Sequence, residues 1–170
     1  MLSAAQLETF DREGYLVVPD VLDDDVLAPV RAEYEALLDE LYAGWQRDGL
    51  VGEAVGFEAR LKAAYTAGLD WFQPFDISLP FSTITPDTPM HFSQAVVNML
   101  TAPALLDVAE SMLGPELTSN PIQHIRIKMP SELLDADDTR AHVGNTMWHQ
   151  DRGGTHDEAD KTDMITVWIA

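Results

Sequence analysis

The spacing of apolar residues changes along this chain from a helical to an alternating pattern, and this change limits the folds that the chain can adopt. Apolar side chains between positions 26 and 45 recur at helical spacing, which predicts one long amphipathic helix. They are Val26, Leu27, Val30, Tyr34, Leu37, Leu38, Leu41 and Trp45. Residues 122–129 instead alternate apolar and polar side chains, which predicts a strand. Because helical patterns come first and strand patterns come late, the sequence predicts an α+β protein.

Shorter segments follow the same two patterns. The first predicted helix begins at Ser3, a residue that caps helices well, and ends at Gly14. Further helices are predicted over residues 58–67, 93–100 and 103–113, and short strands over residues 15–18, around Trp148 and over residues 164–170. Residues 70–89 are expected to form a long loop with short strands.

No repeat, low-complexity tract or domain boundary interrupts the sequence. We therefore expect one domain over residues 1–170. The chain stops at Ala170 inside an apolar strand pattern, with no turn or polar tail. A strand that ends in this way leaves its backbone groups unpaired, so we expect the domain to be truncated after Ala170.

Composition and charge exclude several classes of protein. The hydrophobic content of 46% fits a globular core, and a net charge of −19 repels nucleic acids and anionic membranes. The N-terminus has no signal pattern, and no apolar run approaches the roughly 18 residues of a membrane helix, so we expect a cytoplasmic protein with a small-molecule substrate. Because the chain contains no cysteine, a bound metal must take nitrogen and oxygen ligands.

The segment Trp148-His149-Gln150-Asp151 carries the chemistry that the sequence predicts. In an extended backbone, side chains two residues apart point the same way, so His149 and Asp151 can reach one cation. They supply two arms of the two-histidine, one-carboxylate arrangement that holds non-haem Fe(II). A second such pair, His156 and Glu158, lies in a polar, glycine-containing stretch that is typical of a solvated loop. A zinc hydrolase built on His149, Asp151 and His156 is a weaker alternative.

Four segments together resemble the phytanoyl-CoA dioxygenase family. They are residues 10–22 (FDREGYLVVPDVL), Lys128-Met129-Pro130, Trp148-His149-Gln150-Asp151 and Thr166-Val167-Trp168-Ile169-Ala170. The resemblance implies a double-stranded β-helix, a cupin-like jelly roll, with the N-terminal helices packed on its larger sheet. It also implies Fe(II) as cofactor and 2-oxoglutarate as co-substrate.

The resemblance assigns roles to individual residues. His149 and Asp151 match the first two iron ligands, and Trp168 matches a pocket tryptophan beside 2-oxoglutarate. His124 falls where the family often places another residue that touches 2-oxoglutarate. Each of the last two has a plain alternative, because Trp168 also fits a core aromatic residue and His124 a hydrogen-bonded strand residue.

Two residues of the family pattern have no counterpart here. The family's second iron-binding histidine and the arginine that grips 2-oxoglutarate lie later in sequence than Ala170. His91, His124, His142 and His156 are the possible substitutes for the third ligand.

We therefore predict an Fe(II)- and 2-oxoglutarate-dependent dioxygenase that hydroxylates a C–H bond of a small molecule and is inactive or impaired as this chain alone. Asp151 favours hydroxylation over halogenation, because iron halogenases leave that position vacant for halide. The alternative function is a non-catalytic jelly-roll binding module that uses the same cavity without a metal.

Overall fold

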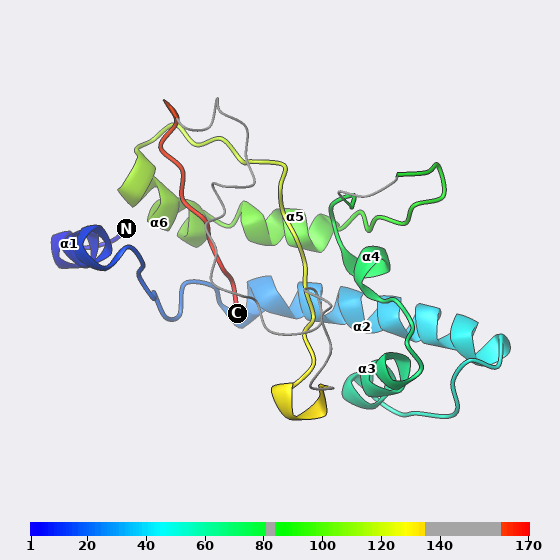
Figure 1. The fold of residues 1–170 in the computed structure, drawn as a ribbon. Coiled ribbons are helices and arrows are strands. Elements are labelled where there is room, and N and C mark those ends of the chain that lie inside the picture. The colour runs from blue at the N-terminus through cyan, green and yellow to red at the C-terminus, as the bar shows by residue number, and fades with distance from the viewer. Residues whose placement is uncertain (81–83, 135–160) are drawn as a thin grey trace. The chain divides into compact units, whose positions relative to one another are not determined.

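A computed structural model describes residues 1–80, 84–134 and 161–170 of the chain. Within these ranges the elements are, in order, α1 (Ala4–Glu13), α2 (Asp24–Arg47), α3 (Phe57–Thr66), α4 (Phe72–Phe75), α5 (Gln94–Leu100), α6 (Pro103–Leu113) and the 3-10 helix η1 (Ser131–Leu133) (Figure 1). The chain divides into two compact units: unit 1 comprises Met1–Leu27, Val96–Ser119 and Met147–Ala170, and unit 2 comprises Ala28–Ala95 and Asn120–Thr146. Because both units are assembled from separate stretches of sequence, no single point in the chain divides them.

The predicted helices are confirmed, and local sequence signals explain their ends. Ser3 and Gln6 form a reciprocal capping box at the start of α1, and Gly14 ends that helix with a left-handed φ of 77°. The Asp23 side chain accepts a hydrogen bond from the backbone N–H of Val26 at 3.1 Å, at the start of α2. Helix α4 was not predicted. It lies within the stretch that the sequence assigned to a loop.

The core of unit 2 lies between α2 and the segment that carries α3 and α4. Along α2, buried side chains repeat every four residues, which directs one stripe of the helix inward. The buried side chains of this core are Tyr34, Leu38, Tyr42, Leu61, Ala64, Tyr65, Trp71 and Phe75. The rings of Tyr34 and Phe75 meet edge to face, with centroids 5.6 Å apart. The indole N–H of Trp71 donates to the carbonyl of Ile127 at 3.4 Å, so the core also holds an extended segment from much later in sequence.

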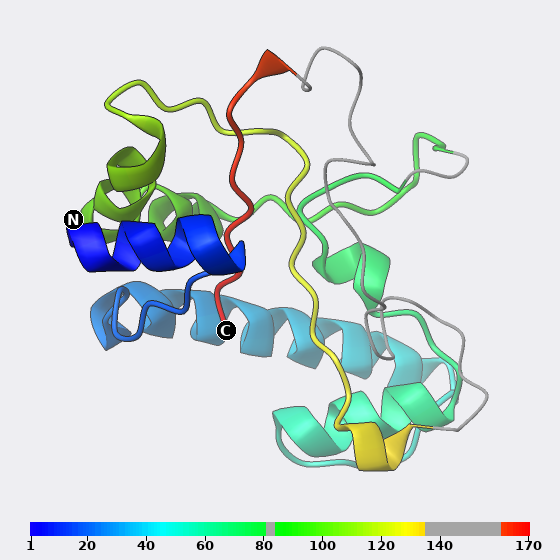
Figure 2. The same cartoon turned by 60° about the vertical axis from the view of Figure 1, so that its left-hand side comes forward.

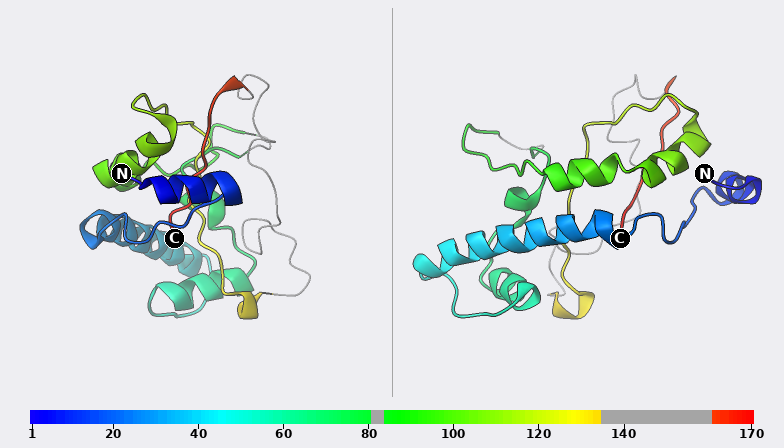
Figure 3. Two further views of the ribbon diagram at one scale, coloured as in Figure 1. Left: turned by 90° about the vertical axis from the view of Figure 1, so that its left-hand side faces the viewer. Right: turned by 180° about the vertical axis from the view of Figure 1, so that it is seen from behind.

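That extended segment, residues 120–130, leads into η1. Figure 2 shows it running alongside the other elements of unit 2 before η1 turns next to α3, and the two views of Figure 3 show the same neighbours. Met129 near its end is only 5% exposed. The segment therefore belongs to the core of unit 2, although it contains no helix until η1.

Unit 1 holds the N-terminus, α6 and the C-terminal residues 161–170. Helices α1 and α6 lie side by side in Figure 2. The backbone N–H of Leu2 donates to the Ser111 hydroxyl at 2.9 Å, and the terminal amino group lies 4.0 Å from the Asp107 carboxylate. Among the described residues no single helix is long and apolar enough to span a membrane, although α5 and α6, bent by 45°, meet that criterion as a pair.

The predicted α+β jelly roll, with helices packed on its larger sheet, is wrong. No β-strand is assigned in residues 1–80, 84–134 or 161–170, which are helical or irregular. The predicted strand at residues 122–129 shows why alternation misleads, since alternation fixes which side chains face inward and says nothing of a backbone partner. The N–H of Ile122 donates to the Asn120 side chain and that of Ile125 to the Asp76 side chain, where a neighbouring strand would otherwise accept. The predicted strand around Trp148 lies outside the described residues.

The burial of Leu38 on the inward face of α2 leads to a stability prediction. Leu38 is fully buried, so Leu38→Ala removes packed methyl groups and should lower the free energy of unfolding by about 2–5 kcal/mol. The matched control is Leu50→Ala, because Leu50 is 50% exposed and its truncation should change stability by no more than about 0.5 kcal/mol. Urea denaturation of both variants measures the difference, and equal losses would contradict the described core.

Candidate functional site

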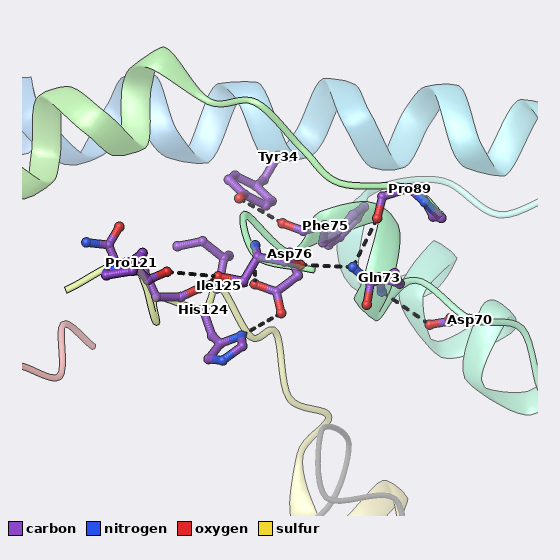
Figure 4. Close-up of polar contacts among 11 residues, drawn as sticks. Tyr34, Asp70, Gln73, Phe75, Asp76, Pro89, Pro121, His124 and Ile125 are labelled. Carbon is purple, nitrogen blue, oxygen red and sulfur yellow. Dashed lines mark hydrogen bonds and ion pairs between the residues drawn. The ribbon is translucent and has the colours of Figure 1, made fainter. Parts of the chain in front are cut away.

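A buried carboxylate lies at the centre of the polar contacts in unit 2. Asp76 follows the last turn of α4 and is only 9% exposed. Its Oδ2 lies 2.7 Å from Nδ1 of His124, and its Oδ1 accepts from the backbone N–H groups of Ile125 at 3.2 Å and Ser78 at 3.4 Å (Figure 4). Its backbone also takes part, since its carbonyl accepts from the N–H of His91 at 2.8 Å. The carboxylate thus joins the end of α4 to the extended segment.

His124 lies on that extended segment, which a second residue also anchors. The Ser78 hydroxyl donates to the carbonyl of Gln123 and has a longer contact of 3.5 Å with the carbonyl of Pro121. The His124 side chain is 21% exposed and the Asp76 side chain 13%. Figure 4 shows the imidazole turned so that one nitrogen faces the carboxylate. The ring is therefore held in one orientation and is still partly open to solvent.

A second histidine–carboxylate pair lies in the same unit. Nε2 of His91 is 2.6 Å from Oε1 of Glu33 on α2. The rings of His91 and Tyr34 meet edge to face, with centroids 5.5 Å apart. Burial by itself would raise the pKa of Glu33. Hydrogen bonds from the side chains of Ser93 and His91, the charge of His91 and a hydrogen bond from the backbone N–H of Ala95 together lower it by more, so the pKa lies below its ordinary value of 4.5. Because Ser93 and Ala95 flank the first residue of α5, Glu33 also caps that helix.

Two further groups have altered acidity. Burial, followed by the nearby charges of Glu33 and Asp76, raises the pKa of Tyr34, whose hydroxyl donates to the carbonyl of Phe75 at 2.9 Å. Burial and then the neighbouring Arg126 lower the pKa of Lys128. Tyr34 is therefore a neutral hydrogen-bond donor at neutral pH.

The comparisons with known proteins identify the family. The family described as phytanoyl-CoA dioxygenase (PhyH) matches residues 10–170. This chain belongs to the phytanoyl-CoA dioxygenase family. No significant match was found among curated proteins or among solved structures. The family is one of oxygenases, and its members generally use Fe(II) and 2-oxoglutarate.

The predicted site residues of this family member fall in three places. His149 and Asp151, the predicted iron ligands, lie outside the described residues, as do His142 and His156. His124 belongs to unit 2 and is bound to Asp76. Trp168 belongs to unit 1 and is 72% exposed. Its predicted contact with 2-oxoglutarate and that of His124 stay predictions.

The remaining candidate for a third iron ligand, His91, is paired with Glu33. No group of three or more histidine, aspartate and glutamate side chains that could hold a metal is found in the part of the chain that the structure describes. The donors that the sequence predicts for iron still have the right chemistry, because imidazole nitrogen and carboxylate oxygen suit Fe(II).

Sequence reasoning missed the carboxylates of both pairs. Asp76 and His124 are 48 residues apart, and Glu33 and His91 are 58 residues apart. One local signal pointed to Asp76, namely a charged residue directly after the aromatic-rich segment 71–75. A charge placed beside buried aromatic rings needs a partner, but the sequence does not say which one.

The lowered pKa of Glu33 predicts how stability changes with acidity. A carboxyl group whose pKa is lower in the folded than in the unfolded protein stabilises the fold above its unfolded pKa and loses that contribution as the pH falls through the folded value. Glu33→Gln should therefore be less stable than the unmodified protein at neutral pH, with the difference shrinking below about pH 4.3. The measurement is urea denaturation between about pH 7 and pH 3.

Glu35→Gln is the control for this prediction, because Glu35 lies on the same helix with an exposed side chain. The free energy of unfolding of Glu35→Gln should differ little from that of the unmodified protein, and this difference should not shrink with falling pH as that of Glu33→Gln does. A stability difference for Glu33→Gln that stays constant across the acid range would contradict the prediction.

Proposed function

We propose that this chain is an Fe(II)- and 2-oxoglutarate-dependent dioxygenase that hydroxylates a C–H bond of a small molecule. The observation that carries the proposal is the family match over residues 10–170, which includes every motif that the sequence shares with the family. The net charge of −19 agrees with a small-molecule substrate, because such a surface repels polyanionic partners. We also propose a cytoplasmic location, on the sequence patterns given in the first subsection and not on the charge.

His149 and Asp151 are the residues that we assign to the metal. One histidine and one aspartate would offer Fe(II) a nitrogen donor and an oxygen donor, and both donor types suit this ion. When bound, the iron supplies the oxidative chemistry, with dioxygen and 2-oxoglutarate as its co-substrates. Asp151 favours hydroxylation, because its carboxylate takes the position that a halogenating site keeps open for halide.

The other assigned residues bind and orient the co-substrate. His124 presents an imidazole whose orientation Asp76 fixes, and a protonated imidazole can donate to a carboxylate of 2-oxoglutarate. Trp168 offers one N–H donor and a broad apolar face, which suits a wall that positions the ligand and excludes water. The protein's part is to place the reacting groups and to limit access of solvent.

Removal of the metal ligands tests the assignment directly. The full-length protein, given Fe(II) and 2-oxoglutarate, should release succinate. His149→Ala and Asp151→Ala should each lower this turnover by more than about 100-fold. Substitution of a residue that only hydrogen-bonds to a metal ligand already costs about 10- to 100-fold, and loss of a ligand itself should cost more. The matched control is His156→Ala, taken from the second histidine–acid pair, which should leave turnover unchanged.

Unchanged turnover after His149→Ala and Asp151→Ala would defeat the metal assignment. A titration with Mn(II) in place of iron separates the proposal from a non-catalytic binding protein. Stoichiometric binding that both substitutions weaken supports the oxygenase, and no binding together with no succinate release supports the binding protein. Loss of succinate release in His156→Ala would instead point to His156 as the third iron ligand.

The role of His124 has its own test. His124→Asn places an amide N–H where Nδ1 lies and so keeps a donor to Asp76, but it deletes Nε2. If Nε2 binds 2-oxoglutarate, the dissociation constant of the co-substrate should rise about 10- to 100-fold, which is the cost of one hydrogen bond to a charged group. Calorimetric titration with 2-oxoglutarate in the presence of Mn(II) measures this rise. An unchanged constant in a folded variant would remove His124 from the site.

A further inference from the structure

We propose that Asp76 is a positioning residue that keeps a proton on Nδ1 of His124 and thereby makes Nε2 the nitrogen offered to the ligand. The part of this inference that concerns the ligand rests on the proposed function. The part that concerns the proton rests on the described contacts alone.

The contacts of Asp76 determine which atom donates. An ionised carboxylate can only accept hydrogen bonds, so the nitrogen 2.7 Å from Oδ2 has to carry the proton. The other oxygen, Oδ1, is already taken by the backbone N–H groups of Ile125 and Ser78. Because Asp76 is only 9% exposed, water can do little to replace any of these donors. The carboxylate therefore fixes both the plane of the ring and the place of its proton.

The consequence falls on the second ring nitrogen. No hydrogen bond to Nε2 is found among the residues that the structure describes, and the side chain keeps 21% of its surface exposed. With Nδ1 protonated, a neutral ring offers a lone pair at Nε2, and a protonated ring offers a donor there. A donor at Nε2 suits an anionic ligand such as 2-oxoglutarate, and the carboxylate of Asp76 offsets the positive charge of the ring that provides this donor. Asp76 thus acts on the ligand through His124.

The neighbouring anchor allows a structural role to be separated from this one. Ser78 also ties the extended segment to the end of α4, through the carbonyls of Pro121 and Gln123, without touching the imidazole by its side chain. If Asp76 only held the segment in place, Ser78→Ala and Asp76→Asn would act alike on the ring. If Asp76 sets the proton, only Asp76→Asn changes the ring.

Asp76→Asn has a specific expected effect. In the asparagine variant the side-chain oxygen should stay with the two backbone N–H donors, which leaves the NH₂ group facing Nδ1 of His124. An NH₂ group can only donate, so Nδ1 has to become the acceptor and the ring proton has to move to Nε2. The substitution keeps the shape of the side chain and reverses the tautomer of its partner.

Nitrogen NMR of the chain labelled with ¹⁵N-histidine tests this directly, because the chemical shifts of the two ring nitrogens report which one is protonated. His124→Asn assigns the His124 signals by their loss. His91 is an internal reference of opposite kind, because its Nε2 and not its Nδ1 faces a carboxylate. We expect a protonated Nδ1 in the unmodified protein and in Ser78→Ala, and a bare Nδ1 in Asp76→Asn.

A bare Nδ1 in the unmodified protein would overturn the proposal, and this spectrum needs no variant to fold except for assignment. An unchanged tautomer in folded Asp76→Asn would overturn it as well. Both outcomes are independent of iron, of 2-oxoglutarate and of turnover, so they leave the proposed function untouched.

A double-mutant cycle tests the ligand-directed part. Asp76→Asn should weaken 2-oxoglutarate binding by about three- to tenfold, since a hydrogen bond from a charged donor is replaced by one from a neutral donor. In the His124→Asn background the same change should have no further effect. Equal weakening in both backgrounds would show a merely structural role and overturn this part. Absence of any 2-oxoglutarate binding would defeat the proposed function, and the NMR result would still decide the role of Asp76.

Discussion

A charge that leaves water has to be satisfied by fixed donors, and unit 2 is built around one such charge. Asp76 is nearly buried, and its two oxygens accept from His124, Ile125 and Ser78. Removal of the carboxylate would leave buried N–H groups without partners, which costs more than the bonds themselves contribute. The hydroxyl of Tyr34 extends the same arrangement to α2 through the carbonyl of Phe75. The long helix, the short helix α4 and the extended segment thus share one set of polar contacts.

The helices could be predicted because their signals are local. The capping box at Ser3 and the left-handed Gly14 act within four residues of the helix ends that they define. Helix α4 was not predicted because it is only four residues long and contains Pro74. The side chain of Asp70, before this helix, accepts a hydrogen bond from the N–H of Phe72 at 2.8 Å, but one acidic residue is no helix signal by itself. A turn of this length is held by its surroundings and not by propensity.

The absence of strands from the described residues, and the two polar pairs, could not be predicted for a different reason. Alternation at residues 122–129 correctly buries Met129, but it carries no information on whether another backbone lies alongside. Likewise, the acidic residues of this chain are numerous, and nothing local distinguishes Glu33 or Asp76 from the others. Their partners, His91 and His124, are 58 and 48 residues away, so only the folded chain selects them. The candidate site depends on these long-range choices more than the helices do.

The two histidine–carboxylate pairs differ in the nitrogen that they use, and this difference separates their roles. His91 meets Glu33 through Nε2, the nitrogen farther from its own backbone, and its ring packs against Tyr34, so the outer end of the ring is committed to the fold. His124 meets Asp76 through Nδ1, the nitrogen nearer the backbone, so the outer end of that ring stays available. Glu33 also caps α5, which gives the first pair a structural task. Of the two, only His124 combines a fixed orientation with a nitrogen that can reach a ligand, and it is the one that the family resemblance assigns to the co-substrate.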